Sequence, residues 1–105
     1  KIQTILVIHD LNDYSKINRK DLQQLEVPIH ESIKGDTLNI YDVASFDANH
    51  IIIIDKPGHI ISNKLLKLTG ISANKEKISV IEYDDDEMPD YIKIAEQMDQ
   101  IIKKL

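Results

Sequence analysis

The chain has 105 residues and a mass of 12.1 kDa, the size of one small domain. Its 42% hydrophobic and 30% charged residues are typical of globular proteins and argue against a disordered chain. A net charge of −5 argues against non-specific nucleic-acid binding, and the absence of cysteine excludes disulfides, thiolate metal sites and cysteine nucleophiles.

The first half of the chain alternates predicted strands and helices. Residues 2–8 form an apolar, β-branched run that predicts a strand, and an imperfect helical stripe over residues 14–25 predicts a helix. Residues 27–33 alternate apolar and polar side chains, which indicates a half-exposed strand. Because Pro28 lacks an amide proton, this strand should lie at a sheet edge. A turn then leads to a predicted short helix at residues 37–46.

The second half continues the alternation. The four consecutive isoleucines at residues 51–54 have no solvent-facing position, so they predict a central strand covered on both sides. A helix should follow at residues 60–69, with Gly70 just beyond its end, and residues 78–81 should form the fourth strand. Residues 91–105 carry the clearest helical stripe of the chain.

Four such strand–helix units build a parallel sheet with helices on both faces, a three-layer α/β sandwich. The central place of residues 51–54 and the edge place of residues 27–33 together predict the strand order 2-1-3-4. A fifth strand joins the sheet if a short segment near Tyr91 is also extended. The expected sheet therefore has four or five parallel strands.

Neither a linker nor an internal repeat is visible, so we predict a single domain over residues 1–105. Because the chain begins with Lys1 and not with Met, we expect it to be processed or excised from a longer protein. No apolar run reaches the ~20 residues that span a bilayer, and no signal peptide is visible. We therefore expect a cytoplasmic protein without a membrane partner.

Polar residues follow three of the predicted strands, where ligands of open α/β sheets bind. The first strand delivers His9 and Asp10 to this edge, the third Asp55 and the fourth Glu82. Converging carboxylates repel each other unless a proton or cation intervenes, so Asp10 and Asp55 are candidate ligands of a Mg²⁺ ion. The same residue types favour turns and helix caps, so the pattern leaves a purely structural role open.

Two segments resemble response-regulator receiver domains. The run TILVIHD ends in an acid after the first strand, and FDANHIIIIDKPG looks like the third strand with its loop, which puts Asp55 at the phosphoacceptor position. The resemblance implies a flavodoxin-like fold of the CheY type, with Asp10 as one member of the acidic pair and His9 where the other acid is usual. It also implies Mg²⁺ as the cofactor and signal transduction in a two-component system as the setting.

The last third of the chain departs from the receiver pattern. Glu82 stands near the place where the family carries Ser or Thr, and Lys93 stands for the family's lysine without the proline that follows it there. These departures indicate a degenerate, atypical receiver. The implied function is a receiver-like regulatory or protein-interaction module that is not an enzyme. Its partner would be another protein or a second copy of the chain, with no direct contact to nucleic acid.

Three alternatives remain open. The first is a Mg²⁺-dependent receiver that accepts a phosphoryl group on Asp55, supported by Asp10 and Lys93. The second is a small metal- or phosphate-dependent enzyme built on the strand-end acids. The third is an α/β protein similar to the phosphotransferase-system B components or the low-molecular-weight tyrosine phosphatases, whose fold is compatible but whose catalytic cysteine this chain lacks.

Overall fold

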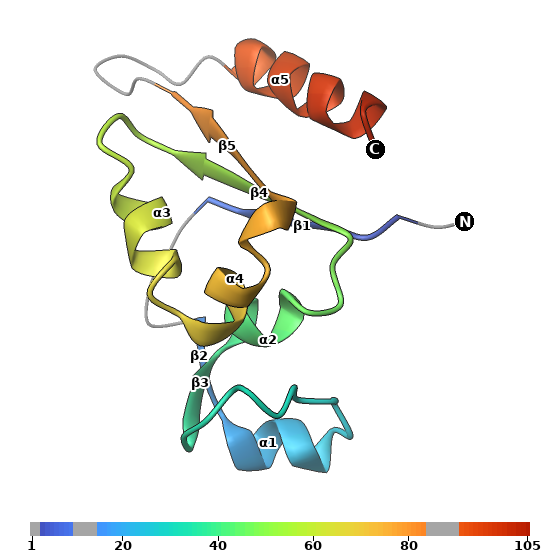
Figure 1. Ribbon diagram of the computed structural model, residues 1–105, viewed down its shortest axis with the longest axis vertical. Helices are drawn as coiled ribbons and strands as arrows, with labels where there is room; N and C mark the ends of the chain where they lie inside the picture. The colour runs from blue at the N-terminus through green and yellow to red at the C-terminus, as the bar shows by residue number, and fades with distance from the viewer. Residues whose placement is uncertain (1–2, 10–14, 84–90) are drawn as a thin grey trace.

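The computed structural model of the chain describes residues 3–9, 15–83 and 91–105. Within these ranges the architecture is α/β, with a three-stranded parallel sheet, a two-stranded antiparallel sheet and mostly short helices (Figure 1). In chain order the elements are β1 (Ile5–Ile8), β2 (Lys16–Asn18), α1 (Arg19–Gln24), β3 (Thr37–Asn39), α2 (Ile40–Ala44), β4 (His50–Asp55), α3 (Ile60–Leu65), α4 (Thr69–Ala73), the 3₁₀ helix η2 (Lys75–Lys77), β5 (Ile78–Glu82) and α5 (Tyr91–Lys103).

The parallel sheet has the strand order β1-β4-β5, so β4 lies in its centre. The isoleucines at positions 51–53 are fully buried, which confirms the prediction of a central strand covered on both sides. In the register of the sheet, Ile8 lies beside Ile53 and Asp55 lies beside Glu82. Because β1, β4 and β5 are the first, third and fourth predicted strands, this part of the predicted order is confirmed.

The two faces of the sheet pack against different helices, because successive residues of a strand point to opposite sides. On one face, Ile8 and Ile53 pack with Leu65 of α3 and Ile71 of α4. We call this the inner face; its side chains in the main hydrophobic cluster are those of Leu6, Ile8, Ile51, Ile53 and Ile78. α5 lies on the opposite side of the sheet (Figure 1), which we call the α5 face. By alternation, the aliphatic side chains of the α5 face are Ile5, Val7, Ile52, Ile54 and Ile81.

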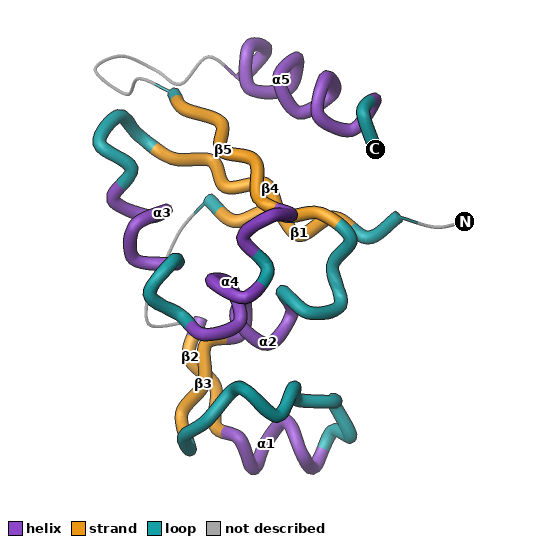
Figure 2. The backbone as a smooth tube through the Cα atoms, in the orientation of Figure 1, coloured by secondary structure: helices purple, strands orange, loops and turns teal. Residues whose placement is uncertain are grey.

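The second predicted strand is wrong, and the parallel sheet is smaller than expected. Residues 27–33 lie in a loop, and the pair β2–β3 stands apart from the three-stranded sheet (Figure 2). The side chains of Val27, Ile29 and Ile33 belong to a second hydrophobic cluster, which also contains Leu22 of α1. A loop lying on this cluster produces the same alternation of apolar and polar residues as a strand. The parallel sheet therefore has three strands instead of four or five.

β2 and β3 occupy segments that the sequence predicts as helices. Ile17 of β2 pairs with Leu38 of β3, and both belong to the second hydrophobic cluster. Cross-strand packing therefore overrides the helical stripe, since local propensity is weak compared with tertiary contacts. The predicted helix at residues 14–25 is reduced to the six residues of α1, and the one at residues 37–46 to the five residues of α2.

The predicted helix at residues 60–69 is divided into α3 and the start of α4, and Gly70 lies inside α4 instead of beyond a helix end. A Cβ atom on Gly70 would lie 2.6 Å from the backbone oxygen of Asp42 in α2, so glycine allows the two helices to approach closely. The Asp42 carboxylate accepts a hydrogen bond from the Ile71 amide at 2.9 Å. The last predicted helix is confirmed as α5, which begins at Tyr91, so no strand forms there.

Candidate functional site

Asp55, the last residue of β4, has a fully buried side chain that holds the loop and helix following it. Its Oδ1 atom accepts hydrogen bonds from the amide of Lys56 at 2.8 Å and from the amide of Ile61 at 3.4 Å. Its Oδ2 atom accepts from the amide of Ser62 at 2.7 Å and from the Ser62 hydroxyl at 2.8 Å. A carboxylate offers about four acceptor positions, so these donors use its hydrogen-bonding capacity.

Asp55 satisfies amides that an N-cap residue usually satisfies. The residue before α3 is His59, whose side chain makes no capping hydrogen bond and whose backbone is left-handed, with φ 53°. Gly58 also has a positive φ of 94°, so the loop between β4 and α3 turns tightly. The turn brings the amides of the second and third helical residues, Ile61 and Ser62, to the Asp55 carboxylate.

The hydrogen bonds decide the ionisation of Asp55. Burial on its own raises the pKa of the carboxyl, because a charged group loses solvation. The amide and hydroxyl of Ser62, together with the amides of Lys56 and Ile61, lower the pKa and outweigh the burial. The net pKa of Asp55 lies below its ordinary value of 3.8, so the side chain is a carboxylate at neutral pH.

His9 and Asp55 both follow the ends of strands but lie on opposite faces of the sheet. His9 is exposed and lines a cavity with Ile54 on the α5 face. Asp55 is one residue further along β4 and therefore belongs to the inner face. The predicted meeting of these two side chains is thus wrong. Asp10, the other predicted partner of Asp55, lies outside the described residues.

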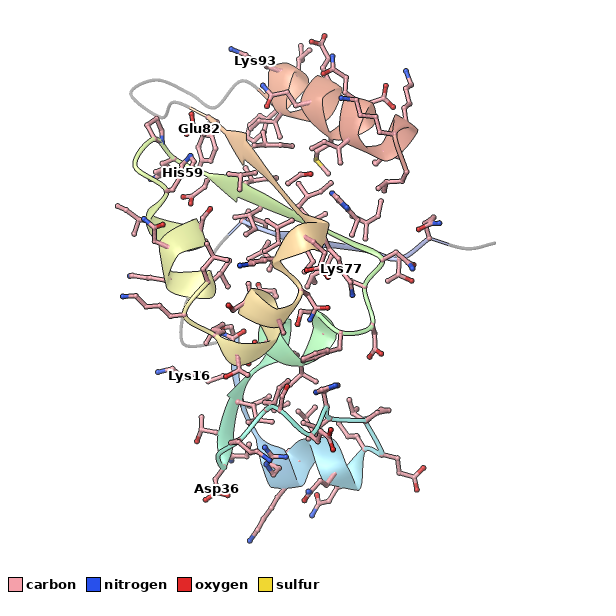
Figure 3. The ribbon with its side chains drawn as sticks, in the orientation of Figure 1. Lys16, Asp36, His59, Lys77, Glu82 and Lys93 are labelled. Atoms are coloured by element: carbon pink, nitrogen blue, oxygen red, sulfur yellow. The ribbon has the colours of Figure 1, made fainter. Side chains whose placement is uncertain are left out.

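Glu82 and Lys93, the remaining predicted site residues, make no printed contact with Asp55 in the described part of the chain. Glu82 lies beside Asp55 in the sheet register, but its carboxylate forms a hydrogen bond with Nε2 of His59 (Figure 3). Lys93 is exposed on α5 (Figure 3), and none of the four hydrogen bonds to the Asp55 carboxylate comes from it. The sequence analysis missed the His59–Glu82 pair, because 23 positions separate the two residues.

A cavity of about 350 Å³ lies on the α5 face near the carboxyl ends of the strands. Its lining in the described part of the chain is mainly apolar and aromatic and comprises His9, Ile54, Tyr83, Tyr91 and Ile94. The sequence analysis identified only His9 among these residues. The signal that would have indicated the others is the pair of tyrosines on either side of the acidic segment 84–87.

No group of three or more His, Asp or Glu side chains is arranged to hold a metal ion in residues 3–9, 15–83 and 91–105. The candidate Mg²⁺ site therefore keeps Asp55 as its one described ligand, and the place of Asp10 stays a prediction. Among the described helices, none has the length and apolar character needed to cross a bilayer.

Comparison with known proteins identified no relative. No protein-family model matches the chain, and no similar protein was found among the curated proteins or the solved structures. The functional argument therefore depends on the residues and their contacts.

Proposed function

We propose that the chain is a receiver-like protein-interaction module that is not phosphorylated, and that Asp55 has a structural role in it. The observation that carries the proposal is the buried Asp55 carboxylate with its four hydrogen bonds. The order β1-β4-β5 is compatible with three strands of a flavodoxin-like sheet. The assignment to that fold is part of the proposal.

Access to the carboxylate supports this reading of Asp55. A phosphoacceptor aspartate attacks phosphorus with a carboxylate oxygen, which needs an available lone pair and room for the incoming group. Both oxygens of Asp55 instead face donors from the following loop and from α3, and the side chain has 0% exposure. Phosphorylation would break the hydrogen bonds to Ser62 and displace α3 from the end of β4.

The hydrogen bonds also disfavour a divalent cation at Asp55. Mg²⁺ requires near-octahedral oxygen ligands and keeps several waters, so it needs space in front of a carboxylate oxygen. At Asp55 the amides of Lys56 and Ser62 occupy that space, one at each oxygen. The acid next to it in the register, Glu82, forms its own pair with His59.

Exposed apolar side chains support the interaction role. Tyr91 and Ile92, at the start of α5, are 70% and 74% exposed, and Tyr91 borders the cavity on the α5 face. Exposed aromatic and aliphatic side chains of this kind are common in protein–protein contacts. The net charge of −5 favours protein partners over nucleic acid.

A titration with Mg²⁺ and beryllofluoride, followed by amide NMR, tests the proposal. We expect the amides of Lys56, Ile61 and Ser62 to keep their chemical shifts, because their acceptor is not available to an added ligand. Asp47→Asn, at an exposed position, controls for weak cation binding to surface acids. Saturable shifts of the three amides that disappear in Asp55→Asn would contradict the proposal and support a phospho-accepting receiver.

A further inference from the structure

We propose that β1 pairs with β1 of a second copy of this chain in the antiparallel direction. The two three-stranded sheets would then join into one sheet of six strands. This inference names a partner for the interaction module proposed above and rests on that proposal. It is argued from the backbone of β1, from the composition of residues 3–9, and from the symmetry that antiparallel pairing requires.

β1 is an edge strand, with β4 on one side only. The amide of His50 in β4 donates to the backbone oxygen of Thr4 at 3.3 Å, so the backbone groups of Thr4 point toward β4. Backbone groups alternate in direction along a strand, so those of Ile5 and Val7 point away from β4. No backbone hydrogen bond in the described part of the chain joins these two residues to another element.

The edge formed by β1 lacks the features that usually prevent strand pairing. Proteins protect exposed edges with lysine, proline, bulges or inward-pointing charges. Residues 3–9 contain no charged residue, no proline and no glycine, and Ile5 and Val7 are only half-buried. The opposite edge strand, β5, differs because Lys77 precedes it and the exposed Glu82 ends it. Of the two edges, β1 is therefore the one suited to pairing.

The sequence of β1 is self-complementary under a twofold axis perpendicular to the sheet. When Leu6 lies opposite Leu6 of the second copy, Ile5 lies opposite Val7 on the same face. Aliphatic side chains then meet on both faces, and cross-strand pairs of this kind stabilise antiparallel sheets. Ile5 and Val7 have outward-pointing backbone groups, so each such pair exchanges two hydrogen bonds.

Charge favours this contact over contacts elsewhere on the chain. Each copy carries a net charge of −5, so two copies repel each other over most approaches. Residues 3–9 bring no charge of either sign into the contact. The twofold pairing at β1 thus places no like charges opposite each other within the paired strands.

Sedimentation of the full chain over a range of concentrations, with two matched variants, tests the pairing. Val7→Pro removes an amide that points away from β4, where proline is tolerated in an edge strand. Val80→Pro removes the equivalent outward amide of β5, since Tyr83 donates to Asp55 and the alternate residues point outward. We expect a wild-type dimer, a dissociation constant raised roughly tenfold or more by Val7→Pro, and little change in Val80→Pro.

A cross-linking measurement decides the matter if Val7→Pro fails to fold. The chain has no cysteine, so Leu6→Cys introduces a single thiol that the proposed register places opposite its symmetry mate. We expect Leu6→Cys to form a disulfide dimer under mild oxidation and Val80→Cys to remain monomeric at the same concentration.

Several results would overturn the pairing. These are a wild-type chain that stays monomeric at millimolar concentration, a dimer more sensitive to Val80→Pro than to Val7→Pro, or a failure of Leu6→Cys to cross-link in a dimeric sample. The last two would show that a different surface, or a different register, is used. Failure of the proposed function is distinguishable, because beryllofluoride shifts at Asp55 would contradict that function without changing the oligomeric state.

Discussion

Ser62 donates two hydrogen bonds to one oxygen of Asp55, from its amide at 2.7 Å and from its hydroxyl at 2.8 Å. Both residues are buried, and the pair joins the end of the central strand β4 to the first turn of α3. Hydrogen bonds to a charged acceptor are stronger than those between neutral groups. The strand-end aspartate is therefore part of what holds the helix layer to the sheet.

Asp55→Asn should lower the free energy of unfolding by about 2–3 kcal/mol. An asparagine retains one acceptor atom, but its NH₂ group would face donors of the loop or of Ser62, which would then be buried without an acceptor. Urea denaturation measures the difference. Asp47→Asn, at an exposed position, should change stability by less than about 0.5 kcal/mol. Equal losses in the two variants would rule out a structural role for the carboxylate.

The stabilisation by Asp55 should depend on pH. Because the pKa is lowered in the folded state, the unfolded chain binds the proton first as the pH falls. The contribution is complete above the unfolded pKa of about 3.9, and it is lost as the pH falls from there through the folded pKa. The stability difference between wild type and Asp55→Asn should therefore be constant above about pH 5 and shrink below about pH 4. A difference that is the same at pH 3 and pH 7 would contradict this account.

Gly70→Ala should destabilise the chain by about 1–3 kcal/mol. The added Cβ atom would lie 2.6 Å from the backbone oxygen of Asp42 and 2.9 Å from Cε2 of Phe46, so α4 must move away from α2. Thermal unfolding followed by circular dichroism measures the loss. Ser72→Ala, at an exposed position of the same helix, is the matched control and should be neutral or slightly stabilising. A neutral Gly70→Ala would mean that the close approach of the helices is not required.

Arg19→Lys should loosen the loop that replaces the predicted second strand. Arg19, the sole arginine in the chain, donates from Nε to the backbone oxygen of Gly35 at 2.7 Å and from Nη2 to that of Ile33 at 2.6 Å. Lysine keeps the charge but cannot reproduce this planar fork. Hydrogen exchange of the loop amides should accelerate by about tenfold while the β4 amides are unchanged. Lys20→Ala, on the neighbouring exposed residue, should leave the loop amides at the wild-type rate.

The central strand could be predicted because the isoleucines at positions 51–54 record two-sided burial in the sequence itself. The edge of the sheet could not be predicted in this way. The alternation over residues 27–33 suits a half-exposed strand, and it suits a loop lying on a hydrophobic cluster equally well. Likewise, Ile17 contributes to a helical stripe, but its cross-strand partner Leu38 lies far along the chain. Only long-range contacts separate these alternatives.

At the site, the position of Asp55 could be predicted and its role could not. Its place after a buried strand is a local property of the sequence. Its role depends on Ser62, seven residues later, and on a loop in which Gly58 and His59 have positive φ. The expectation that His9 lies near Asp55 fails because residues at strand ends still alternate between the faces of the sheet.

The five-residue helix α2 contacts both hydrophobic clusters. Tyr41 packs against the main cluster beneath the sheet, whereas Val43 is a buried member of the second cluster around α1 and β3. Each cluster has its own strands, so the single cooperative melting expected of a chain this small depends on how firmly α2 couples the two. Substitutions that weaken α2, more than those that weaken either cluster, are the ones that would separate the melting of the chain into two transitions.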